Sequence, residues 1–170
     1  MSPIDRIPQI KTAEDGGEVD VDWGMLNYYR ATLVAKCSGL SDEQLISRAV
    51  PPSNLSLMGL LRHMADVEVY WFGEVFAGFD ATYAYDPDMI GADFDNLAEK
   101  SGEEVATKFL ECVQKSNEIT AGVSLDTLSE KKEDGAINLR FIVVHLIEEY
   151  ARHCGHADLL REVIDGETGD

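Results

Sequence analysis

The sequence predicts an all-α protein, a four-helix bundle. Four long segments carry apolar residues at helical spacing, and helix-capping or stop residues flank most of them. No segment shows the alternating apolar and polar pattern of a half-buried strand. With 170 residues, 45% of them hydrophobic, residues 1–170 are long enough for a single domain with a sizeable core. These observations together favour four packed helices over any fold that contains a sheet.

The first half of the chain begins with an arm and continues with two helical segments. Residues 1–19 contain prolines, a Gly-Gly pair and many charges without a period, which predicts an extended arm. The first long helix is expected to begin near Asp20 or Asp22, either of which could cap it, and to stop at Gly39. A further turn of helix is expected from Ser41 to Arg48, because Ser41 and the glutamine three residues later form a capping box.

The other three long helices follow, separated by long connections. The second is expected at residues 56–76, the third after a capping box formed by Ser101 and Glu104, and the fourth at residues 138–164, before Gly166. Irregular stretches connect the second helix to the third and the third to the fourth. The first of these, residues 78–100, is long enough to cross the end of the bundle and to cover a site.

Charge and cysteine content restrict the partners. The net charge of −18 repels phosphate backbones and anionic membrane surfaces, so we expect neither a nucleic acid nor a membrane as partner. The three cysteines are scattered without paired spacing, which is typical of a reducing cytoplasm rather than of a disulfide framework. The N-terminal stretch has no apolar core of signal-peptide length, and we expect a cytoplasmic protein.

The four histidines occupy only two of the predicted helices. His145, Glu149, His153 and His156 fall within an arc of about 80° on the fourth helix, where apolar residues should face the core. An ionised carboxylate is costly to bury without a partner, so Glu149 requires a cation, a metal ion or a raised pKa. His63 lies on an apolar face of the second helix. A metal ion held between the two helices accounts for the whole group, with hydrogen-bonded core histidines as the alternative.

Several neighbours have two interpretations. His145, one turn before Glu149, could orient a ligand, shuttle a proton or bind the metal itself, or it could be a hydrogen-bonded core residue. His156 is expected to bond to a neighbouring helix or subunit rather than to the metal. Cys154 is expected to be a small apolar filler and Glu148 a solvated surface charge. Aromatic residues could line a pocket or belong to the core, and these are Tyr70, Trp71 and Tyr150.

Three familiar catalytic patterns are absent from the sequence. The Glu-x-x-His pairs of ferritin-like di-iron bundles are missing, because Glu149 and His153 are four residues apart. His145 is followed by Leu-Ile, which excludes the His-Glu-x-x-His signature of metalloproteases. No serine or cysteine lies in a nucleophile elbow. One metal site with three protein ligands is the most that these residues can build.

Two segments resemble a known superfamily. LMGLLRHMADVEVYWF and, far downstream, VHLIEEYARHCGHADLLREVIDG are similar to the DinB-like four-helix-bundle metalloproteins, most closely the actinobacterial branch related to mycothiol-dependent maleylpyruvate isomerase. The superfamily holds its metal through a histidine of the second helix and a histidine-or-glutamate, x-x-x, histidine pair of the fourth. Position by position, this pattern matches His63, Glu149 and His153. The resemblance covers roughly residues 20–166.

The resemblance implies a cytoplasmic metalloprotein, often dimeric, that uses a low-molecular-weight thiol such as mycothiol on an electrophilic substrate. The two imidazoles and one carboxylate that it implies as ligands favour a divalent transition ion, zinc or nickel. They leave an open coordination position at which a thiol would be deprotonated. The expected reactions are S-transfer and thiol-assisted isomerisation, with His145 as the candidate catalytic residue beside the metal. The alternatives are a non-catalytic dimeric metal-binding or stress-related protein and a metal-dependent hydrolase. An intact ligand set favours an enzyme.

Overall fold

The computed structural model describes residues 12, 14–80, 83, 92–131 and 135–169. The helices in these ranges are α1 (Glu18–Ala35), α2 (Asp42–Leu45), α3 (Leu57–Glu68), the π-helix η2 (Val69–Phe76), the short 3₁₀ helices η3 (Ala92–Phe94) and η4 (Leu97–Glu99), α4 (Gly102–Thr120) and α5 (Leu139–Asp165). Within the described ranges the only β-type pairing is an isolated bridge between Leu128 and Asn138. The predicted all-α class is therefore confirmed. Most of the predicted N-terminal arm lies outside the described residues.

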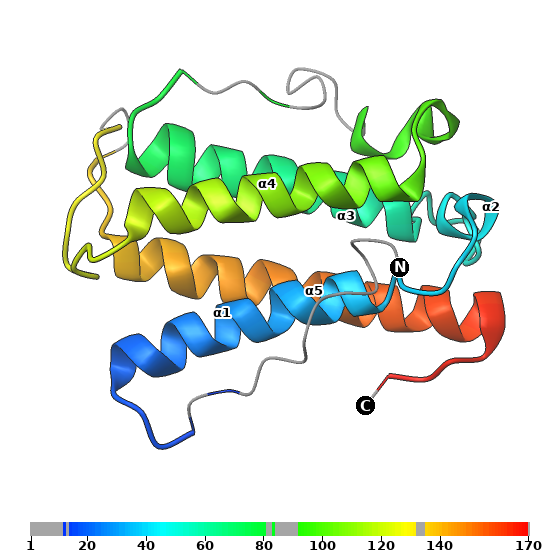
Figure 1. The fold of residues 1–170 in the computed structure, drawn as a ribbon, viewed down its shortest axis with the longest axis horizontal. Helices are drawn as coiled ribbons and strands as arrows, with labels where there is room; N and C mark the ends of the chain where they lie inside the picture. The colour runs from blue at the N-terminus through cyan, green and yellow to red at the C-terminus, as the bar shows by residue number, and fades with distance from the viewer. Residues whose placement is uncertain (1–11, 13, 81–82, 84–91, 132–134, 170) are drawn as a thin grey trace.

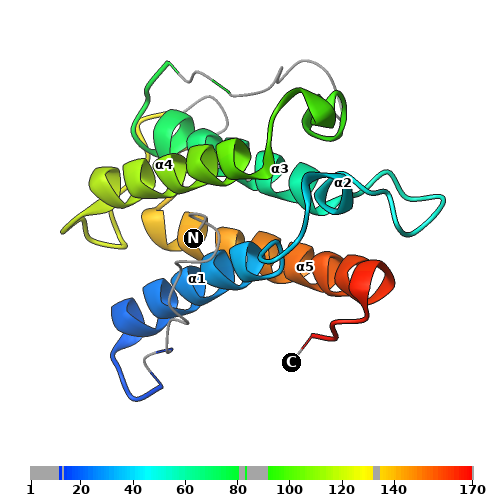
Figure 2. The same ribbon diagram turned by 45° about the vertical axis from the view of Figure 1, so that its right-hand side comes forward.

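The four long helices pack as two layers. Figures 1 and 2 show α3 and α4 in one layer and α1 and α5 in the other. The buried apolar side chains of these helices form one core. Each fully buried leucine-sized side chain contributes about 1.5–3 kcal/mol relative to exposure. The core draws on all four helices, and its largest fully buried members include Leu26, Leu33, Leu60, Leu61, Met64, Phe72, Phe109, Leu139 and Tyr150.

Several predicted helix ends are confirmed and others are corrected, since α1 ends at Ala35 rather than at Gly39 and α2 at Leu45 rather than at Arg48. Ser41 and Ser101 form the two expected capping boxes, and Gly166 ends α5 with a φ of 82°. The first helix, however, begins at Glu18 after an N-cap at Gly17, rather than at Asp20 or Asp22. The reason is that Glu18 and Asp20 lie within the first turn, where the helix dipole favours carboxylates that need not be caps.

The second long helix has the predicted extent but not the predicted uniform geometry. Ser56 caps α3 through a 3.2 Å bond from the Gly59 amide, and the helix then changes to the π form from Val69 to Phe76. Apolar periodicity did not indicate this change. A π-helix winds more residues into each turn, so it shifts the directions of the side chains that follow Glu68.

The connection after η2 is fastened to α3. Arg62 donates to the carbonyl oxygens of Asp95, at 2.7 Å, and Ala92, at 3.0 Å. The Phe94 ring lies so close to Gly59 that a Cβ atom at that position would overlap it. These contacts place η3 directly beside His63, as expected of a connection that covers a site.

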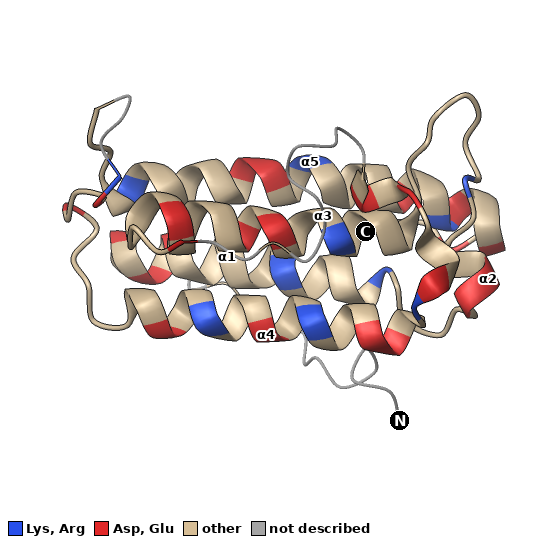
Figure 3. Ribbon diagram, turned by 90° about the horizontal axis from the view of Figure 1, so that it is seen from above, with Lys and Arg blue, Asp and Glu red and all other residues tan. Residues whose placement is uncertain are grey.

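Charges are distributed widely over the surface. Figure 3 shows the acidic residues spread over the four long helices. Of the helices in the described ranges, none has a long enough apolar stretch to span a bilayer.

Candidate metal centre

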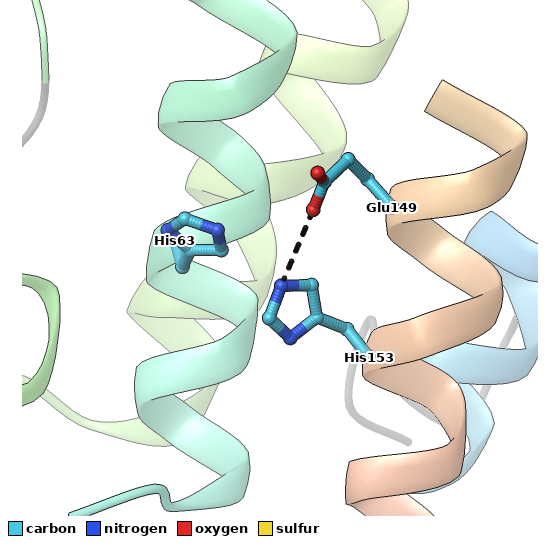
Figure 4. Close-up of side chains that lie close together, drawn as sticks. All are labelled: His63, Glu149 and His153. Carbon is cyan, nitrogen blue, oxygen red and sulfur yellow. Dashed lines mark ion pairs between the residues drawn. The ribbon is translucent and has the colours of Figure 1, made fainter. Parts of the chain in front are cut away.

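Three predicted ligands come together between α3 and α5. His63 projects from α3 toward Glu149 and His153 on α5 (Figure 4), and one ligand atom from each lies within 4.8 Å of the other two. The ring centroids of His63 and His153 are 4.9 Å apart. His153 Nε2 lies 3.6 Å from Glu149 Oε2, the contact drawn dashed in Figure 4. We call these three residues the triad.

Asp93 fixes the orientation of His63. Its Oδ2 atom lies 3.0 Å from His63 Nδ1, so the imidazole donates that N–H to the carboxylate and keeps Nε2 free. A carboxylate behind a histidine in this way is the usual partner of a metal-bound imidazole. The sequence analysis missed Asp93, because one acidic residue among several in residues 78–100 carries no periodic signal. Only the packing of η3 on α3 distinguishes it.

His153 is held neutral. Burial, and to a smaller extent the neighbouring His63, His156 and Arg152, lower the pKa of this imidazole to about 4. At neutral pH its contact with Glu149 is therefore not an ion pair, and a nitrogen lone pair is available. His153 Nδ1 lies 3.3 Å from His156 Nδ1, so one of these two nitrogens donates a hydrogen bond to the other. The structure thus places the contact of His156 within α5, whereas the sequence predicted a partner on another helix or subunit.

His145 lies at the edge of the triad. Its Nε2 atom is 3.9 Å from Glu149 Oε1 and its Nδ1 atom 3.7 Å from Glu148 Oε2. The ring packs against Trp71, with centroids 4.5 Å apart, and its side chain remains 27% exposed. At this exposure His145 is not a fully buried core residue, and its functional role stays a prediction.

Charged neighbours of the triad are partly solvated. Glu148 has a 49% exposed side chain and pairs with Arg152, which agrees with its predicted surface position. Arg152 also places Nη1 3.7 Å from Glu149 Oε1 and is 56% exposed. Such an exposed cation compensates the Glu149 charge only weakly.

The triad fits a divalent transition ion. Two ligands that bind a tetrahedral ion at about 2.1 Å lie about 3.4 Å apart, close to the observed separation of the His153 and Glu149 atoms. Two neutral imidazoles and one carboxylate suit zinc and its neighbours in the first transition row. Small side-chain rotations would bring the third donor, His63, to the same distance.

A second polar group, which the sequence analysis also missed, lies inside the bundle. Arg30 of α1 donates to both carboxylate oxygens of Glu68 on α3, at 2.8 and 2.7 Å. Tyr150 of α5 donates to Glu68 at 2.7 Å, and Asn117 of α4 accepts from Arg30 at 3.1 Å. We call these four residues the interhelical network. Tyr150 is thus a core residue, and burial raises the pKa of its phenol.

The cysteines are all buried thiols. Burial raises the pKa of Cys37 and Cys154 to about 12 and that of Cys112 to about 11. Cys154 is 3.6 Å from the Tyr29 carbonyl oxygen and faces away from the triad, in agreement with its predicted role as filler.

One family model matches most of the chain. No individual curated protein matches the chain. The family model described as mycothiol-S-transferase matches residues 23–166, a range that includes the triad, the interhelical network and nearly all of the bundle. The chain therefore belongs to the mycothiol S-transferase family of the DinB-like superfamily, in agreement with the predicted resemblance.

Proposed function

We propose that this protein is a metal-dependent transferase that joins the sulfur of mycothiol to an electrophilic carbon. The observation that carries the proposal is the convergence of two imidazoles and one carboxylate in a chain of the mycothiol S-transferase family. The triad is accessible, because His63 has a 30% exposed side chain and Glu149 a 19% exposed one.

The nucleophilic thiol has to come from a cosubstrate. A thiol reacts as its thiolate, and thiols with a pKa of about 11 or 12 are protonated at neutral pH. The chain's own cysteines are therefore poor nucleophiles. Their free state also supports a reducing compartment, and we retain the cytoplasm as the proposed location.

The triad would hold the ion, and its surroundings keep the two histidines in a form that can bind a metal. A divalent ion bound there, zinc or nickel, would lower the pKa of an approaching thiol and so supply the thiolate at neutral pH. Asp93 keeps the His63 Nε2 atom free, and burial keeps the His153 imidazole uncharged at neutral pH. Glu149 supplies a negative charge that neutralises part of the charge of the ion.

His145 is the proposed proton acceptor. In the transfer the thiol loses its proton, a carbon–sulfur bond forms and the bond to the leaving group breaks. His145 lies next to Glu149 and is partly open to solvent, so it can take the thiol proton and release it to water. Isomerisation by reversible thiol addition would use the same residues, and this reaction stays a prediction from the resemblance. The homodimer is likewise a prediction from the resemblance.

Metal binding is the first test. Chelator-stripped protein should bind about one zinc or nickel ion per chain, measured by titration and elemental analysis. His63→Ala and His153→Ala should abolish tight binding, while Glu111→Ala, an exposed carboxylate of α4, should leave it intact. Saturable binding that survives both histidine substitutions would show that the ligands are misassigned.

Turnover is the second test. Metal-loaded protein should form the mycothiol adduct of monochlorobimane, and Glu149→Ala should abolish the reaction while Glu111→Ala retains it. Turnover that persists after chelation would refute the metal dependence. Hydrolysis of an electrophile without consumption of thiol would support the hydrolase alternative, and metal binding without any turnover would support the non-catalytic one.

A further inference from the structure

Four rings form a continuous surface beside the triad. Tyr70 and Trp71 come from η2, Phe141 and His145 from α5, and we call them the aromatic row. Neighbouring centroids are 5.2 Å apart for Tyr70 and Trp71, 4.5 Å for Trp71 and His145, and 6.0 Å for Phe141 and His145. Phe141 is 53% and Tyr70 38% exposed. Such a patch of exposed rings is typical of a surface that contacts a ligand or partner.

The aromatic row begins at the triad. His145 Nε2 is 3.9 Å from Glu149 Oε1, and His145 precedes Glu149 by one helical turn. Phe141 lies one further turn away, about 12 Å from Glu149 along the helix axis. A molecule whose reactive carbon lies at the triad would therefore extend over the rings if it were two or three rings long.

The backbone geometry at Trp71 also indicates a functional surface. Trp71 projects from a π-helical segment, and π-helical turns are rare and occur frequently at functional sites. Phe141 is as exposed as Leu159, an apolar residue far along the same helix, but only Phe141 belongs to a cluster of rings next to the triad. Because the row contacts the triad through His145, we interpret these exposed rings as a binding surface for a small ligand rather than as ordinary exposed apolar residues.

The charges near the row select against anions. Lys131 lies 5.8 Å from the Tyr70 ring centroid, but it pairs with Glu74. Glu148 and Glu149 stand at the other end of the row, and Arg152 pairs with Glu148. A carboxylate-bearing electrophile would be repelled by these acidic groups, and the nearby cations Lys131 and Arg152 already pair with carboxylates of the protein.

We propose that the aromatic row binds the electrophile, and that the electrophile is an uncharged planar aromatic molecule, such as an activated haloarene. This inference rests on the proposed function and names the substrate class of its site. With a haloarene, the thiol sulfur bonds to the ring carbon, the carbon–halogen bond breaks, halide leaves and the thiol proton passes to solvent. Phe141 and Trp71 determine specificity by stacking on the ring system.

Binding can be tested without metal or turnover. The chain has two tryptophans, so Trp23→Phe leaves Trp71 as the only one, and its fluorescence can be excited apart from that of the tyrosines. The unreactive nitroarene 4-nitrobenzyl alcohol should quench its fluorescence saturably in chelator-stripped protein. Adding Phe141→Ala should weaken binding by about five- to tenfold, the effect of losing one aromatic contact, while adding Leu159→Ala should not. Failure of this experiment would overturn the substrate class and leave the proposed S-transfer intact.

Kinetics supply the second readout. For 4-chloro-7-nitrobenzofurazan, a haloarene with two fused rings, Phe141→Ala should raise KM by a similar factor, while KM for chloroacetamide, which has no ring, should remain unchanged. An equal change for both substrates would show that Phe141 only supports the structure, and would overturn the proposal. Conversion of a dimer to a monomer by Phe141→Ala, with unchanged nitroarene binding, would identify the row as a subunit interface and would likewise overturn it.

Discussion

Replacing Glu68 with glutamine should destabilise the protein severely. Glu68 is fully buried, and both of its carboxylate oxygens accept bonds from Arg30, whose side chain is only 4% exposed. Tyr150 adds a third bond at 2.7 Å. Glutamine keeps the shape of the side chain but removes the negative charge, so it would leave the Arg30 guanidinium buried without a counter-ion.

The expected loss follows from these contacts. Breaking a buried ion pair from one side costs about 3–5 kcal/mol. For a domain of this size each kcal/mol lowers Tm by about 2–4 °C, so Glu68→Gln should lower Tm by roughly 6–20 °C. Tyr150→Phe removes one hydrogen bond to a charged acceptor and should cost about 1.5–3 kcal/mol. The double replacement Arg30→Met with Glu68→Leu leaves no orphan charge and should cost less than Glu68→Gln alone.

Urea unfolding of chelator-stripped protein at pH 7 measures all three free energies, provided that the m-values agree. Exposed Glu111→Gln is the matched control and should change the free energy of unfolding by less than about 0.5 kcal/mol. A loss below about 1 kcal/mol for Glu68→Gln would refute the argument. So would a double variant less stable than the single variant, because stability would then come from the pair itself rather than from avoiding an orphan charge.

The remaining predictions concern the triad and its supports. Asp93→Asn should weaken zinc affinity by about 10- to 100-fold in isothermal titration, because the amide orients His63 less firmly; unchanged affinity would show that Asp93 does not orient the ligand. Gly59→Ala should also weaken zinc binding, since the new Cβ overlaps the Phe94 ring and displaces η3 with Asp93, whereas circular dichroism should show the helices intact. The metal-free protein should lose stability as pH falls from about 6.5 to about 4, because His153 binds a proton in the unfolded chain but stays neutral when it is buried. His153→Gln should reduce this loss, measured by thermal unfolding at pH 7.5 and 5. The same pH dependence in both proteins would contradict the assignment.

Local sequence patterns were sufficient for the fold class and for the shared face of Glu149 and His153, while the family resemblance selected His63 as the third member of the triad. Helical periodicity and caps such as Ser101 are local, and a histidine and a glutamate at four-residue spacing necessarily share a helix face. The π-helical turn at Val69, by contrast, depends on packing that no apolar period records. Asp93 and Glu68 are ordinary acidic residues in sequence, and only the distant partners His63 and Arg30 distinguish them.

The triad and the interhelical network depend on the same two helices. Glu149 and Tyr150 are neighbours on α5, about 100° apart, so Glu149 faces the open side while Tyr150 reaches Glu68 in the core. On α3, Glu68 follows His63 by little more than one turn. Apolar side chains tolerate small axial shifts between helices, but directional bonds of 2.7 and 2.8 Å to one buried carboxylate do not. The network therefore fixes how far α3 can slide along α5, and with it the separation of His63 from the other two members of the triad.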